Sequence, residues 1–70
     1  MGVSYKKLWK LLIDRDMKKK DLQAAAKVGP STISKLSNNE YVSMEVLVKI
    51  CTALKVDFSD IMELVPDAHV

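Results

Sequence analysis

The segment 29–38 carries polar side chains in a pattern that suits contact with a polar, negatively charged surface. Gly29 can cap a helix, and Pro30 can take the first helical position, where the missing N–H costs nothing. On such a helix Ile33 and Leu36 point towards a core. The opposite face carries small hydroxyls, a cation and an amide: Ser31, Ser34, Lys35 and Asn38. This face fits a groove of base edges and phosphates, although an ordinary solvated face is the alternative.

Charge is unevenly divided along the chain. Residues 1–35 hold nine lysines and arginines against three acidic residues, and residues 36–70 hold two against six. The halves therefore carry +6 and −4, which gives the net charge of +2. A basic half suits a polyanion, and an acidic half suits a different surface or partner. Because the segment 29–38 overlaps the basic half, the charge pattern favours groove binding.

Length and composition predict a single small domain. Seventy residues with 49% hydrophobic side chains can form one core, and we expect order over about residues 4–65, followed by a short C-terminal tail. The single cysteine, Cys51, excludes an intrachain disulfide and fits a reducing cytoplasm. The chain shows neither a signal-peptide pattern nor a run long enough to cross a bilayer. We therefore expect a cytoplasmic protein that makes no membrane contact.

Apolar spacing predicts five helices and no strand. The expected ranges are 4–16, with Ser4 as its cap, 19–27, 30–38, 44–54 and 58–63. Each of the last four follows a pattern in which one apolar residue precedes the cap and another lies in the first turn. These pairs are Met17 with Leu22, Val28 with Ile33, Val42 with Leu47, and Val56 with Ile61.

The expected caps differ in quality. Ser43 and Asp57 are good caps, and Asp60 occupies the capping-box position of the last helix. Lys18 is a poor cap because its side chain has no acceptor. We expect the Asp21 carboxylate to reach back to that helix start instead, where the helix dipole also favours a negative charge.

Helices 19–27 and 30–38, joined by a tight turn, have the spacing of a helix-turn-helix. With the helices that follow, the chain resembles the Cro/CI-type (XRE-like) DNA-binding domains of phage repressors and bacterial regulators. The resemblance covers about residues 5–64 and rests on two segments, DLQAAAKVGPSTISKLSNNE and VSMEVLVKICTALKVDFSDIMEL. The second segment also resembles the short stand-alone branch of the family. It implies an all-α, compact five-helix lambda-repressor-like fold. The implied function is a sequence-specific transcriptional regulator of double-stranded DNA, expected to be a repressor, with helix 30–38 in the major groove.

The chain departs from the family pattern at several positions. Lys27 stands where glycine is common, so either it adopts a left-handed turn at a cost of roughly 1 kcal/mol or the turn is built differently. Pro30 replaces a frequent base reader, and Glu40 would repel a phosphate. The positions of a frequent arginine–glutamate pair hold Leu12 and Ser37, for which we expect an apolar contact instead.

The resemblance also implies roles for individual residues. Lysine at a helix start and amides after the recognition helix suit backbone phosphates, and the expected phosphate contacts are Lys18, Lys19, Lys20, Asn38 and Asn39. Lys35 can donate to guanine, and hydroxyls can accept or donate to several bases. The expected base readers are Ser31, Thr32, Ser34 and Lys35. The same residues are compatible with a phage repressor, an antitoxin-like autoregulator or a restriction-system controller.

Because the expected base readers of one chain cover only a few base pairs, we expect a homodimer on DNA. The family places such contacts at the last helix and beyond, so the expected interface is Ile61, Met62, Leu64 and Val65, with Trp9 and Ile13 as the alternative surface.

A protein-interaction module on the same fold is the second hypothesis, favoured by Pro30 and Glu40. An enzyme is not expected, because the sequence shows no nucleophile–base pair. A cofactor, a metal and a small-molecule ligand are not expected either. Asp57 and Asp60 are interpreted as caps, and His69 lacks partner ligands in reach by spacing.

Overall fold

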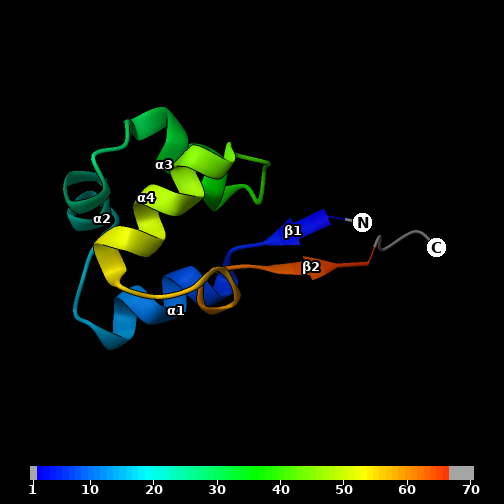
Figure 1. Cartoon of the computed structure of the whole chain (residues 1–70), viewed down its shortest axis with the longest axis horizontal. Helices are drawn as coiled ribbons and strands as arrows, with labels where there is room; N and C mark the ends of the chain where they lie inside the picture. The colour runs from blue at the N-terminus through cyan, green and yellow to red at the C-terminus, as the bar shows by residue number, and fades with distance from the viewer. Residues whose placement is uncertain (1, 67–70) are drawn as a thin grey trace.

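Four helices and a small two-stranded sheet make up the fold (Figure 1). The computed structural model of the chain describes residues 2–66. In chain order the elements are β1 (Gly2–Ser4), α1 (Lys6–Asp14), α2 (Lys19–Ala26), α3 (Pro30–Ser37), α4 (Met44–Leu54), the short 3-10 helix η1 (Phe58–Asp60) and β2 (Glu63–Val65). The prediction of a mainly helical helix-turn-helix fold is confirmed, whereas the predictions of five α-helices and no strand are wrong.

The two ends of the described chain form the sheet. β1 and β2 are antiparallel, and Gly2 lies opposite Val65, Val3 opposite Leu64 and Ser4 opposite Glu63. Ser4 is therefore a strand residue rather than the cap of the first helix, which begins at Lys6. Each strand has only three residues, too few to show alternation in the sequence, and its partner is almost the whole chain away.

The expected helix 58–63 is reduced to the single turn η1. The capping box predicted at its start is present, because Asp57 Oδ1 accepts from the Phe58 N–H at 2.8 Å and Asp60 Oδ2 accepts from the Asp57 N–H at 3.0 Å. The turn ends at Asp60, Ile61 is fully buried, and the chain enters β2 at Glu63.

Local signals set the bounds of the other helices. The N–H of Lys18 donates to Asp21 Oδ2 at 2.8 Å, so the predicted compensation for a poor cap is confirmed. Lys27 has φ 56° and ψ 46°, the left-handed conformation, which decides between the two alternatives for this turn. Ser43 Oγ accepts from the Val46 N–H at 3.2 Å and caps α4.

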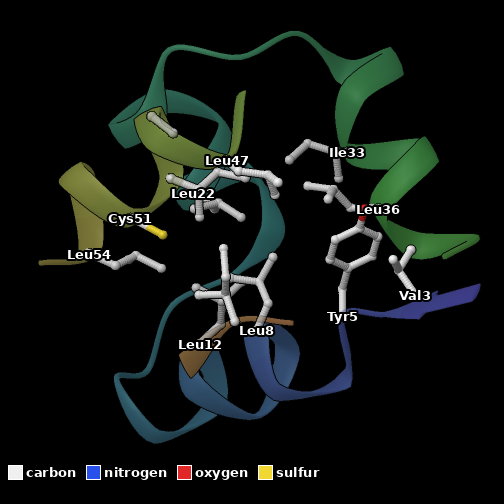
Figure 2. Packing of buried hydrophobic residues seen from close by; sticks show 13 residues of the cluster. Val3, Tyr5, Leu8, Leu12, Leu22, Ile33, Leu36, Leu47, Cys51 and Leu54 are labelled. Atoms are coloured by element: carbon white, nitrogen blue, oxygen red, sulfur yellow. The ribbon is translucent and has the colours of Figure 1, made fainter. Parts of the chain in front are cut away.

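The core lies where α1, α2, α3 and α4 meet (Figure 2). The second member of each predicted apolar pair is buried: Leu22, Ile33, Leu47 and Ile61. The first members are half-buried and pack against that core: Met17, Val28, Val42 and Val56. The apolar pairs thus fix the direction in which the chain enters each turn, and this positions α2 against α3.

None of the helices within residues 2–66 is long and apolar enough to span a membrane.

Candidate nucleic-acid interface

Helix α3 turns its two large apolar residues inward and its polar face outward. Ile33 and Leu36 are buried, which holds the helix on the core. The residues expected to face outward are exposed: Ser31, Ser34, Lys35 and Asn38. Thr32 is only half-buried, so it presents less of its hydroxyl to the outside than its neighbours do. The exposed face has small side chains and one cation.

The start of α2 brings a group of lysines to this region. Lys18, Lys19 and Lys20 are all exposed. The Lys19 Nζ donates to Ser37 Oγ at 2.9 Å, and Ser37 is the last residue of α3. Lys19 therefore lies beside the C-terminal end of α3, and Lys18 and Lys20 adjoin it in the sequence. Sequence reasoning gave Ser37 only an apolar contact with Leu12, whereas the structure gives it a polar partner.

Lys19 also contacts helix α1. Its Nζ lies 4.5 Å from the centroid of the Trp9 ring, within the range of a cation–π interaction. Trp9 is half-buried and packs against the core. One side chain thus connects the first three helices, a contact that sequence reasoning missed because its members lie far apart in the chain.

The loop after α3 is attached to the N-terminal part of the chain through Tyr5. The Tyr5 N–H donates to Asn39 Oδ1 at 3.1 Å, and the Tyr5 hydroxyl donates to the Glu40 carbonyl at 2.8 Å. Asn39 adopts φ 55°, a conformation that asparagine tolerates better than most residues. The Asn39 side-chain oxygen is therefore used inside the fold, and its exposed amide leaves N–H donors for an outside acceptor.

Burial raises the pKa of the Tyr5 phenol above its usual value, which keeps the hydroxyl protonated as the donor to Glu40. Burial also raises the pKa of the Cys51 thiol, and the negative charges of Asp57 and Asp60 act in the same direction. Cys51 is buried on α4, so the neutral thiol serves as a small apolar group.

The residues expected to form a dimer interface differ in how exposed they are. Ile61 belongs to the core and has no exposed surface, so its assignment to an interface is wrong. Met62 is half-buried against the core, whereas Leu64 on β2 is 64% exposed and Val65 is half-buried. On the alternative surface Ile13 is 73% exposed, and Trp9 lies beneath Lys19.

Within residues 2–66, no three side chains of His, Cys, Asp or Glu come together as a metal site would require. His69 lies outside the described residues.

Comparison with known proteins identifies the family. Residues 7–67 match the family described as the Cro/C1-type HTH DNA-binding domain. The crystal structure of the transcriptional regulator VanUg, form II, superposes with a TM-score of 0.90 and is 57% identical, over 94% of this chain and 88% of that one. A search of the curated proteins finds no match. The family match and the similar structure agree with the helix-turn-helix geometry of α2 and α3, and the chain belongs to the Cro/C1-type helix-turn-helix DNA-binding domain family.

Proposed function

We propose that this chain is a sequence-specific, double-stranded DNA-binding transcriptional regulator that acts as a repressor. One observation carries the proposal: Lys19, in the exposed lysine run at the start of α2, is joined to the end of α3 by the 2.9 Å hydrogen bond to Ser37. A cation beside a helix whose exposed face carries small polar side chains fits the two kinds of DNA contact. The cation can bind backbone phosphates, and the small polar side chains can reach base edges. The similar structure is also described as that of a transcriptional regulator, which supports the regulatory role.

In this proposal α3 enters the major groove. Ser31, Ser34 and Lys35 are exposed on it and reach base edges, with Thr32 beside them. Lys35 donates to guanine O6 or N7, whereas the hydroxyls accept or donate and so tolerate more than one base. The face lacks a bidentate reader, because α3 contains neither arginine, asparagine nor glutamine between Pro30 and Ser37. Each chain therefore contributes modest sequence preference.

Phosphate contacts then come from residues near the C-terminal end of α3. Lys18, Lys19 and Lys20 supply positive charge at the N-terminus of α2, where the helix dipole also attracts anions. Asn38 and Asn39, which directly follow the same end of α3, supply amide donors. Repression needs only occupancy of the DNA, which a chain of this size can provide.

We further propose a homodimer that uses the outer edge of β2. Among the described residues β2 pairs only with β1, and Leu64 on β2 is 64% exposed. Unpaired backbone groups at a strand edge are suited to pairing with a second strand. Two copies related by a two-fold axis would read half-sites roughly 34 Å apart, one helical turn.

Capture of genomic fragments by the purified protein, followed by footprinting, tests the DNA-binding proposal. We expect a palindromic site and a steep fall of affinity with salt, because lysines displace counterions from phosphates. Failure to retain any DNA at low salt would contradict the proposal and favour the protein-interaction module.

Sedimentation with and without the palindromic site tests the dimer. Leu64→Lys is expected to leave a monomer, because it places a charge at the proposed interface. Ile13→Lys is the matched control, since Ile13 is also exposed but lies on α1. A dimer that survives Leu64→Lys and is lost in Ile13→Lys would assign the interface to α1 instead.

A further inference from the structure

The contact among Trp9, Lys19 and Ser37 is unusual for a surface lysine because three helices contribute to it. The Lys19 Nζ is 4.5 Å from the Trp9 ring centroid and 2.9 Å from Ser37 Oγ. Trp9 is half-buried against the core, and Ser37 ends α3, so both partners are attached to rigid elements. Lys19 itself is the first residue of α2, so its backbone is fixed as well.

We propose that Trp9 and Ser37 are positioning residues that hold the Lys19 ammonium in place for a DNA phosphate. This inference rests on the proposed DNA-binding function and adds to it two residues that would not themselves touch the DNA bases. An ammonium has three N–H donors, of which Ser37 accepts one. The Trp9 ring attracts the charge through its π face without using a strong acceptor. Donors therefore remain for a phosphate oxygen.

The benefit of such a contact is a smaller loss of freedom on binding. A free lysine side chain has many rotamers, and ordering it against a phosphate costs conformational entropy. For Lys19 that ordering already occurs when the chain folds, because the ammonium has two partners in the protein. Lys20 is an exposed lysine next to it in the sequence and serves as the comparison.

Substitution at Trp9 measures the effect. Trp9→Leu keeps an apolar side chain but removes the aromatic face, whereas Trp9→Phe keeps a ring. We expect Trp9→Leu to weaken binding to a short mixed-sequence duplex by about two- to ten-fold, because the lysine must then be ordered when the DNA binds, and Trp9→Phe to restore most of that loss. Circular dichroism and melting of each variant establish that it is folded.

A double-mutant cycle separates positioning from a general structural role. In a Lys19→Met background, Trp9→Leu should cause no further loss of affinity, because the ammonium it positions is absent. In a Lys20→Met background it should cause the full loss. A loss that persists in the Lys19→Met background would overturn the proposal, since Trp9 would then act through something other than Lys19.

Fluorescence gives an independent readout, because Trp9 is the single tryptophan of the chain. An ammonium above the indole perturbs its emission, so Lys19→Met should change the spectrum of the free protein while Lys20→Met leaves it unchanged. Identical spectra for Lys19→Met and the original chain would overturn the contact itself. These outcomes are distinct from a failure of the proposed function, in which the unsubstituted chain would bind no DNA at all.

Discussion

Replacing Ile33 by alanine tests whether α3 is held on the core only by its two apolar anchors. Ile33 is 8% exposed and belongs to the core, and Leu36 is the other buried residue of α3. The substitution removes three carbons, about 2.4 kcal/mol at roughly 0.8 kcal/mol per buried methylene. The cavity left behind adds to this, so we expect a total loss of about 2–5 kcal/mol in the free energy of unfolding.

A loss of that size is large for this chain. Small domains melt about 4–8 °C lower for each kcal/mol lost, so the expected decrease in Tm is at least about 10 °C. Ile13→Ala is the matched control, because it removes the same atoms from a residue that is 73% exposed and should change stability by less than about 0.5 kcal/mol. Thermal unfolding followed by circular dichroism measures both variants. If Ile33→Ala melted within a few degrees of the original chain, α3 would be held by contacts other than these anchors.

Three further predictions concern single side chains. Lys35→Ala should weaken binding to guanine-containing sites selectively, whereas Lys20→Ala should weaken binding to all sequences and make the salt slope shallower by about one unit; binding titrations over several salt concentrations distinguish the two. Tyr5→Phe removes the donor to the Glu40 carbonyl and should cost about 1–3 kcal/mol of unfolding free energy, measured by urea denaturation; an unchanged midpoint would show that water replaces the hydroxyl. The raised pKa of Cys51 means that the folded chain binds the thiol proton more tightly than the unfolded chain. This difference stabilises the folded state below the ordinary thiol pKa of 9.0, and the stabilisation is lost as pH rises through the folded pKa. In Cys51→Ala the free energy of unfolding should therefore lack this part of its decrease at alkaline pH.

The middle of the chain could be predicted closely from the sequence. The predicted ranges 19–27, 30–38 and 44–54 correspond to α2, α3 and α4, and α4 has the predicted bounds. These helices depend on signals within a few residues of one another, namely caps and the apolar pairs around them. The left-handed turn at Lys27 came instead from the family resemblance, which left a differently built turn open as the alternative.

The ends of the fold depend on distant partners and were not predictable. Val3 and Leu64 pair across the sheet, and neither three-residue strand has a recognisable pattern of its own. Ile61 has the apolar character of an interface residue, but its burial depends on how the chain returns to α1 and α4.

The same limit applies to the candidate site. The outward face of α3 follows from helical periodicity, so its exposed hydroxyls and Lys35 could be predicted. The engagement of Asn39 by Tyr5 and of Lys19 by Trp9 joins residues on separate elements. No periodicity or spacing contains that information, because it arises only when the helices pack.

The pairing of β1 with β2 has a mechanical consequence. In this antiparallel register Gly2 and Val65 form the outermost pair, so a force that pulls the two strands apart from these ends loads one residue pair at a time (Figure 1). The sheet would open like a zipper from Gly2 towards Ser4, before the force reaches Tyr5 and the buried core. The weakest point under tension is thus the sheet, and the helix-turn-helix would keep its shape while the strands separate.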